Sequence, residues 1–424
     1  MGAEKLIELV RDDVFAALWR KCCRTSIAWD EFQKLPMPAG MSPRDAYALV
    51  SALQHRAGTI LPFGNYMPAV SGADNWFYET VEMHRLVRGI VSEVSAGSKL
   101  DRAISALSAR TRLALRASDF AAACERDGFA IAVDEVRAVW SGARVATSPV
   151  ELLAYNFAHA HDRVASLDGR RVSVGVLVML WEALTEGLKM PEGTSRSYMV
   201  AEKKSSPLSS SDGALLAVSS LMDSGPQIEI NAVVRSFLSG GIFWDFNPFP
   251  WANSITELLA RSLIAHREGL PVLAYLPLSD AFLRWEQGRD AERGAFLEAS
   301  PDIGEGYNST THFTRKLQIT VDELRLLKER VSRIEFSEEA WRAALKADGR
   351  FNARQRDVLL SALHNPGARF FVADHERIHG VSHGTAYNDL VNLESLGLLK
   401  RQKTGRAYSF AATARLAKLV GATR

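Results

Sequence analysis

The sequence predicts a mainly α protein, and three observations support this class. Helix start signals recur: Ser42-Pro43, Ser148-Pro149 and Ser173 each place a capping side chain before an apolar pattern. Apolar residues then follow at helical spacing. Segments that break this spacing are few. Strands are therefore expected only as small additions to a helical protein.

The helices are expected in the following order. The first strong one begins after Ser42-Pro43, and a second begins after Ser148-Pro149, where Glu151 supplies the acidic member of a capping box. A third begins at Ser173. The remaining helical patterns span 74–95, 99–116, 211–223, 228–239 and 321–333.

Three segments are not expected to be helical. Residues 57–68 are interrupted by glycine and proline, which predicts an irregular connector. Residues 191–204 begin with Pro-Glu-Gly and then alternate, which predicts a short β-hairpin. The serine-rich run from Lys203 to Asp212 is predicted to be a loop.

The chain is long and almost neutral. Its 424 residues, 47% of them apolar, exceed what one hydrophobic core usually needs. The net charge of +2 excludes a uniformly basic coat for nucleic acid, yet Phe351 to the C-terminus holds 11 basic and 5 acidic residues. Three regions are predicted: a helical region 1–57, a central helical region 58–340 with its core at 117–290, and a basic region 350–424.

The cysteines and the N-terminal segment bear on the compartment. Cys22, Cys23 and Cys124 lack the number and spacing of a disulfide framework or a zinc ribbon, which indicates reduced thiols. The N-terminal segment is acidic where a secretory signal is apolar, and no uncharged apolar run approaches roughly 18 residues. We therefore expect a cytoplasmic protein with no membrane partner.

Residues 353–410 carry a pattern of three helices and a basic hairpin. After the first helix, a short helix Ala373–His379 stops at Gly380 and a longer helix begins at Ser382. Two strand-like arms then flank the turn at 403–406. This pattern resembles the winged helix-turn-helix of many bacterial proteins, which implies double-stranded DNA as a partner and a role in transcription regulation.

The third helix and the hairpin supply the residues expected to contact DNA. Ala386, Leu390 and Leu393 lie on one side of the helix, which leaves polar side chains on the other side for base edges. No acidic residue follows Gly397, so the hairpin suits phosphates. Winged helices also dock proteins, and that alternative stays open. The predicted DNA-binding residues are Ser382, His383, Thr385, Tyr387, Asn388, Lys400, Arg401, Lys403 and Arg406.

One motif in this unit invites a metal interpretation. His375 to His379 match HExxH, which in metalloproteases places two zinc ligands on one helical face. That version lies within a long buried helix and needs a third ligand, whereas Gly380 ends this helix and His383 falls beyond the break. The motif is interpreted as the short second helix of the C-terminal unit, and no metal site is predicted.

The central region contains a loop between two apolar helices. Residues 240–251 interrupt the helical pattern, and Asn253 or Ser254 is expected to cap a helix through Leu258 and Leu263. The backbone N–H groups at such a helix N-terminus can hold an anion.

The same segment resembles a known family. Asn247-Pro248-Phe249, followed by Asn253 and an apolar helix, is similar to the core of the Fic (Fido) family, whose motif is HPFx[DE]GNGRxxR. The hairpin near 193–201 and the appended winged helix fit one bacterial Fic architecture, so the resemblance covers about residues 58–415. It implies a Fic-like helical core with a small β-hairpin flap. Fic enzymes transfer AMP from ATP to a protein hydroxyl with the help of magnesium.

The departures from this motif concern the chemistry itself. Asn247 replaces the histidine base, and an amide cannot accept a proton near neutral pH. Trp251 replaces the acidic magnesium ligand, and Ile255 and Leu258 stand at the motif's two arginine positions near the phosphates. We therefore predict no catalytic residue and no cofactor. The degenerate motif consists of Asn247, Pro248, Phe249, Trp251, Asn253 and Ile255.

Other side chains were considered as replacements. Asp245 precedes the lost base by two residues, but an ordinary loop aspartate is the simpler interpretation. His159 and His161 lie two apart on a helix and cannot share one face. The family's inhibitory helix has its nearest match at 121–128, where its pattern is eroded.

Three functions follow from these patterns. The favoured one is a catalytically degenerate Fic-fold protein that regulates transcription through its C-terminal winged helix. The alternative is a protein adenylyltransferase with a divergent site, which would use ATP and magnesium. The third is an interaction scaffold. A homodimer and a protein partner at the flap near Arg196–Val200 are compatible with each.

Overall fold

The structure is a computed structural model of the chain, and its class is mainly α, as the sequence predicts. It describes residues 9, 11–61, 75–164, 167, 172–189, 215, 218–219, 230–288, 307–364, 367–404 and 407–421. The predicted hairpin at 191–204, the loop at 203–212 and nearly all of the helix at 211–223 lie outside these residues. In the part described, no helix is both long enough and apolar enough to cross a membrane.

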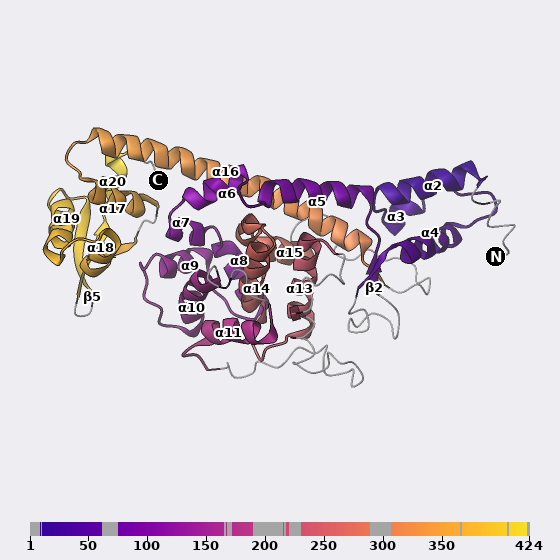
Figure 1. The fold of residues 1–424 in the computed structure, drawn as a ribbon, viewed down its shortest axis with the longest axis horizontal. Helices are drawn as coiled ribbons and strands as arrows, with labels where there is room; N and C mark the ends of the chain where they lie inside the picture. Colours follow the sequence, from indigo (N-terminus) through magenta and orange to yellow (C-terminus); the bar gives the residue numbers. More distant parts are fainter. Residues whose placement is uncertain are drawn as a thin grey trace.

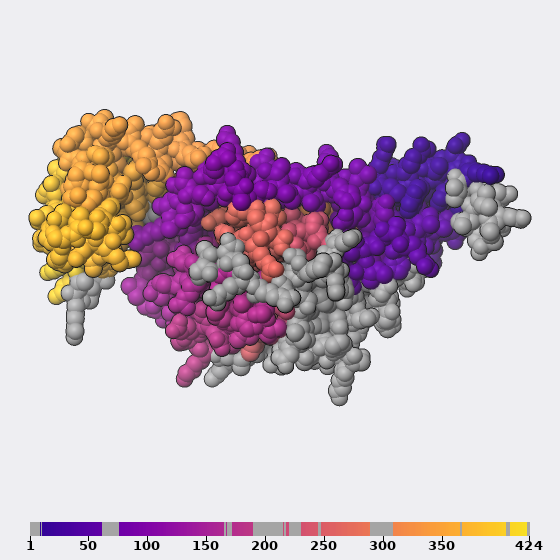
Figure 2. All heavy atoms as spheres, viewed as in Figure 1, coloured from indigo at the N-terminus to yellow at the C-terminus, as the bar shows by residue number. Residues whose placement is uncertain are grey.

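The described residues form three hydrophobic clusters along an elongated molecule (Figure 1). The N-terminal helices lie at one end and the C-terminal unit at the other. Two long helices, α5 (Val81–Val94) and α16 (Thr310–Ala347), run side by side along one edge between them. The remaining helices form a central body beneath this edge. The space-filling view shows the C-terminal unit standing out from the end of that body (Figure 2).

The N-terminal region has a small aromatic core of its own. It consists of α2 (Asp13–Arg24), α3 (Trp29–Phe32) and α4 (Pro43–Ala57). Ser42 caps α4 as predicted, since its side chain accepts from the backbone N–H of Asp45. Phe15 and Phe32 lie at the centre, both almost fully buried.

The prediction of one helix over 74–95 is wrong at its start. Residues 75–77 form strand β2 (Asn75–Phe77), which lies between β1 (Thr59–Ile60) and β3 (Tyr307–Asn308). β2 is antiparallel to β1 and parallel to β3. This pairing depends on residues more than two hundred positions away in sequence, as the register of Trp76 with Asn308 shows. The two residues of β1 also show that the connector at 57–68 is partly regular.

Helix α16 is longer than the predicted segment 321–333. No glycine or proline occurs between Thr310 and Ala347, so nothing interrupts the backbone hydrogen bonds. Val331 is buried against the central body, and Leu345 is buried in the C-terminal cluster. One helix therefore connects two cores and passes without a break through residue 340, the predicted edge of the central region.

The central body is built from helices whose start signals were largely predictable. Ser148 and Glu151 form the expected capping box, and Ser173 caps the helix at 174–185. The pattern at 99–116 divides into two helices because Ser108 caps a new one. These elements are α6 (Lys99–Ala106), α7 (Ala109–Ala114), α8 (Ala117–Arg126), α9 (Val133–Trp140), α10 (Pro149–Val164) and α11 (Val174–Thr185).

The centre of this body is α14 (Asn253–Arg267), which is buried from Asn253 to Ala265. It packs against α13 (Ala232–Phe246), the 3-10 helix η4 (Pro271–Tyr275) and α8, and α15 (Leu278–Glu286) packs against α8 in turn. The prediction that Gly240 ends the helix before the motif is wrong, because α13 continues to Phe246. A Cβ at Gly240 would lie 3.3 Å from Cζ2 of Trp244, so the glycine allows the indole to pack against its own helix.

The C-terminal unit contains the three predicted helices and the predicted hairpin. The helices are α17 (Ala353–His364), α18 (Val372–His379) and α19 (His383–Ser395), and the hairpin strands are β5 (Leu399–Thr404) and β6 (Ala407–Ala412). The sequence patterns missed β4 (Arg369–Phe371) and α20 (Ala414–Leu419). β4 pairs with β6 in an antiparallel sheet of order β4-β6-β5. Its side chains are only half-buried, which explains why no strand pattern stood out.

Candidate functional site

The degenerate central motif forms a short loop between α13 and α14. Asn247 ends α13 with a left-handed backbone (φ 42°), and Ala252 precedes α14 in the same conformation (φ 58°). Such values are uncommon outside glycine and must be held by the surroundings. The side chain of Asn247 is hydrogen-bonded to backbone, since its Nδ2 donates to the carbonyl of Trp244 at 3.3 Å.

Aromatic packing holds the loop in place. The indole of Trp181 stacks on Phe249 with ring centroids 5.3 Å apart and planes 1° apart. Nε1 of the same indole donates to the carbonyl of Trp251 at 2.9 Å. Phe129 meets the ring of Trp251 edge-on. Trp251 is thus an interior packing residue in the structure, at the position where the resemblance expects a magnesium ligand.

Asn253 has a different role from the predicted helix cap. Its Oδ1 accepts from the N–H of Phe249 at 2.8 Å, and its Nδ2 donates to the carbonyl of Phe249 at 2.9 Å. The amide therefore closes the loop onto itself. The N-cap residue is Ala252, which has no side chain that can cap.

The cap of α14 comes from a distant residue, Asp127. The N–H of Ser254 donates to its Oδ1 at 2.9 Å, and the N–H of Ile255 donates to its Oδ2 at 3.1 Å. Burial raises the pKa of Asp127 to about 6, although these hydrogen bonds act in the opposite direction. The N-terminus of α14 already holds an anion, and this anion is a carboxylate of the chain itself.

The positions expected to carry arginines are apolar and closed. Ile255 and Leu258 are fully buried. Arg116, which is buried at the start of α8, donates to the carbonyl of Leu258 at 3.0 Å. Arg126, in the segment that resembles the inhibitory helix, pairs with Glu286 at 2.7 Å and stacks on Trp244 at 4.1 Å. These cations hold helices together.

The two histidines considered as replacements interact with residues of their own helix, α10. Asp245 lies outside the residues whose side chains are described. His159 is exposed and its Nδ1 lies 2.9 Å from the carbonyl of Tyr155, while burial lowers the pKa of His161 to about 4. The sequence did not single out Asp119, whose buried carboxylate accepts from Arg261 at 2.5 Å and from the N–H of Ser279 at 2.6 Å. That pair links α8, α14 and α15.

The C-terminal unit presents the other candidate site, on the outer face of α19. Ser382 caps this helix, and its hydroxyl accepts from the N–H of Thr385 at 3.3 Å. His383 and Asn388 are exposed, and Tyr387 is 37% exposed. On the inner face, Ala386 and Leu390 are completely buried, as their spacing predicts. The helix therefore separates a core face from a polar outer face.

The hairpin beside α19 carries exposed cations and one cation with internal partners. Lys400 and Lys403 are exposed on β5. Arg401 donates to the hydroxyl of Tyr387 at 3.2 Å, lies 3.4 Å from a carboxylate oxygen of Glu394 and stacks on Tyr408. Arg401 therefore connects the hairpin to α19. Arg406 lies outside the described residues.

The HExxH residues occupy α18, which Gly380 ends with a left-handed backbone. His375 is 4% exposed and its Nε2 lies 3.2 Å from a carboxylate oxygen of Asp389 on α19. Glu376 is oriented to His383, at 3.1 Å. Within the described ranges, no three His, Cys, Asp or Glu side chains are grouped so that they could hold a metal.

The chain was compared with known proteins. No protein-family model matches it, and no curated protein matches it. Among solved structures it is similar to the crystal structure of a Fic family protein from Desulfovibrio desulfuricans G20. The sequence identity is 17%, the TM-score is 0.43, and the likeness covers 80% of this chain and 98% of that chain.

Proposed function

We propose that the protein is a DNA-binding transcriptional regulator whose C-terminal unit is a winged helix-turn-helix and whose central body is a Fic-like scaffold without catalytic activity. The observation that carries this proposal is the outer face of α19. There, His383, Tyr387 and Asn388 are exposed beside a strand with two exposed lysines.

The arrangement suits the two kinds of contact that DNA recognition requires. Side chains on the first turns of a recognition helix reach base edges in the major groove, and cations on an adjacent hairpin neutralise phosphates. Asn388 is suited to adenine because its amide nitrogen can donate to N7 of the base while its amide oxygen accepts from the N6 amino group. The acidic residue of α19 nearest to this face, Asp389, is turned inward and neutralised by Arg354.

The central motif supports a scaffold. The base, the magnesium ligand and the arginine are replaced by Asn247, Trp251 and Ile255, two of which are packed in the interior. In addition, Asp127 occupies the N-terminus of α14, where a nucleotide phosphate would have to compete with a buried carboxylate. An active adenylyltransferase needs all of these features changed at once.

The test uses the full-length protein. A randomised pool of duplexes is enriched by the protein, and the affinity for the enriched duplex is measured against a scrambled one at several salt concentrations. The proposal expects a preference for the enriched duplex and an affinity that falls as salt rises, since phosphate contacts release counterions. Absence of binding to every duplex would contradict it.

A parallel assay addresses the enzymatic alternative. The protein is incubated with labelled ATP and magnesium, and transfer of AMP to itself or to other proteins is measured. We expect none, and Asn247→His alone is expected to restore none because Trp251 and Ile255 remain. Transfer of label by the parent protein would favour the adenylyltransferase instead.

A further inference from the structure

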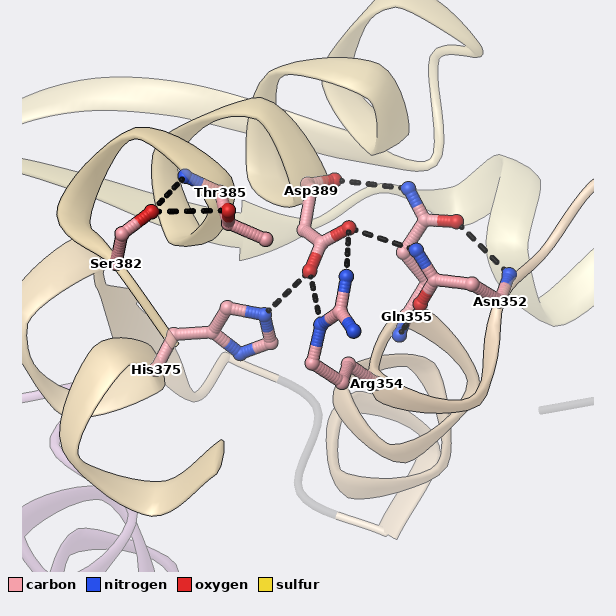
Figure 3. Close-up of polar contacts among 7 residues, drawn as sticks. All are labelled: Asn352, Arg354, Gln355, His375, Ser382, Thr385 and Asp389. Carbon is pink, nitrogen blue, oxygen red and sulfur yellow. Dashed lines mark hydrogen bonds and ion pairs between the residues drawn. The ribbon is translucent and has the colours of Figure 1, made fainter. Parts of the chain in front are cut away.

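A buried polar cluster lies beneath the outer face of α19. Its centre is the carboxylate of Asp389, which is 6% exposed and points between α17 and α18 (Figure 3). Asp389 directly follows Tyr387 and Asn388 in sequence, so one helical turn carries both the exposed face and its internal anchor. A carboxylate in this position needs partners, because an unpaired buried charge is strongly unfavourable.

Partners come from two other helices and from the turn that precedes one of them. Asn352, just before α17, donates its Nδ2 to Oδ1 of Asp389 at 2.7 Å. On α17, Arg354 donates from Nε to Oδ2 at 2.7 Å, and Gln355 donates to the backbone carbonyl of Asp389 at 3.2 Å. From α18, Nε2 of His375 lies 3.2 Å from Oδ2. The two oxygens are thus shared among three side chains.

The cluster keeps the carboxylate ionised. Burial by itself raises the pKa of Asp389, but the hydrogen bonds from Arg354, Asn352 and His375 outweigh burial and hold the pKa below its ordinary value. Apolar contacts such as that of Leu390 resist separation of the helices but permit small rotations. Directed bonds to one carboxylate resist rotation as well, so they fix orientation more tightly than burial alone.

We propose that Asp389 and His375 are positioning residues that set the orientation of α19 and thereby place Tyr387 and Asn388 for recognition of DNA bases. This inference rests on the proposed DNA-binding function and deepens it. It also gives the HExxH motif a role, since the first histidine of the motif holds the recognition helix. Arg354 neutralises the carboxylate that a zinc ion at His375 would need as a further ligand.

The experiment measures a ratio of two affinities for each full-length variant. The probes are the duplex that the parent protein enriches from a randomised pool and a scrambled version of it. Asp389→Asn and His375→Leu are expected to lower the ratio of specific to scrambled affinity by about 5- to 100-fold, the effect of one or two lost base contacts. His375→Gln keeps a donor at a similar reach and is expected to retain most of the ratio.

A matched variant separates positioning from stability. Leu416→Ala removes a buried side chain from the same core without touching the cluster, so it is expected to lower the unfolding temperature and leave the ratio unchanged. Combining Asp389→Asn with Asn388→Ala is expected to cost less than the sum of the two, because both act through the same base contact.

Three results would count against the inference in different ways. An unchanged ratio in both Asp389→Asn and His375→Leu would overturn it while leaving DNA binding intact. One zinc ion per chain, lost in both His375 variants, would replace it with a metal site. If the parent protein enriches no duplex, the proposed function fails, and the inference fails with it.

Discussion

Helices α14 and α19 both begin after a short connection, but their N-termini lie in different surroundings. The N-terminus of α14 is buried, and its N–H groups donate to the carboxylate of Asp127. The N-terminus of α19 is exposed, and the hydroxyl of Ser382 caps it. At both ends, side-chain oxygens accept hydrogen bonds from free backbone N–H groups. Of these two helices, α19 is the one whose capped end is followed by exposed side chains that a large ligand can reach.

This difference shows how a binding helix and a structural helix can share one local pattern. A polar side chain near a helix start indicates a cap in both cases, but it does not indicate whether the end faces solvent. Around α14, Trp181 and Phe249 cover the loop. Around α19, the packing contacts lie on the opposite face of the helix, through Ala386 and Leu390.

The largest expected effect is on the loop that precedes the buried N-terminus of α14. Phe249→Ala removes a buried ring that stacks on Trp181, so we expect the free energy of unfolding to fall by about 3–5 kcal/mol. Phe336→Ala is the matched control. Because Phe336 is 77% exposed, this substitution should change the free energy of unfolding little. Urea unfolding measures both. Equal stability of the two variants would show that the loop is not packed as described.

The second effect concerns the carboxylate that closes α14. The pKa of Asp127 is raised from 3.8 to about 6, so the folded state binds this proton more tightly than the unfolded state. Its contribution to stability is therefore fully present below about pH 4 and is lost as the pH rises through about 6, by roughly 3 kcal/mol in total.

Asp127→Asn cannot titrate and should lose this part of the pH dependence. Urea unfolding at several pH values between 4 and 7 gives the slope of the unfolding free energy against pH in the parent and in the variant. Asp134→Asn serves as the control, since the Asp134 side chain is 91% exposed and should leave the slope unchanged. A parent and an Asp127→Asn protein with the same slope would mean that Asp127 is not buried at the helix end.

The third effect concerns the exposed first turns of α19. Asn388→Ala should reduce the affinity for a preferred duplex by about 1–3 kcal/mol and relax the preference at one base position, while the affinity for scrambled DNA stays the same. Asn392→Ala, one turn further from the N-terminus on the same helix, should have less effect. The measurement is binding to both duplexes at one salt concentration. Equal losses on both would assign Asn388 to phosphate contact.

The smallest effect is expected at the hairpin. Lys403→Ala should weaken binding to all duplexes and reduce the slope of log affinity against log salt by about one unit, as for one lost phosphate contact. Lys346→Ala, an exposed lysine on α16, should leave the slope as it is. Binding at four or more salt concentrations provides the slopes. An unchanged slope in Lys403→Ala would place DNA away from β5.

Some of the site residues could be predicted from the sequence and others could not. The exposed positions of α19 could be predicted because a core face at helical spacing implies a polar face opposite to it. The partners of Arg401 could not, since Glu394 and Tyr387 meet it only when β5 packs beside α19. Asp389 stands at an interior position of the helix, and its spacing alone does not reveal that Arg354 and His375 converge on it.

The sequence by itself determined what depends on neighbours within one or two helical turns. The mainly α class, the caps at Ser42, Ser148 and Ser173, and the three helices of the C-terminal unit follow from local hydrogen bonds and from apolar spacing. Tertiary structure decided what depends on distant residues. Trp76 lies in a strand because Asn308 is beside it, and the end of α14 is closed because Asp127 reaches it from another helix. Such contacts form only when the whole chain packs, since their partners have no fixed separation that a local pattern could record.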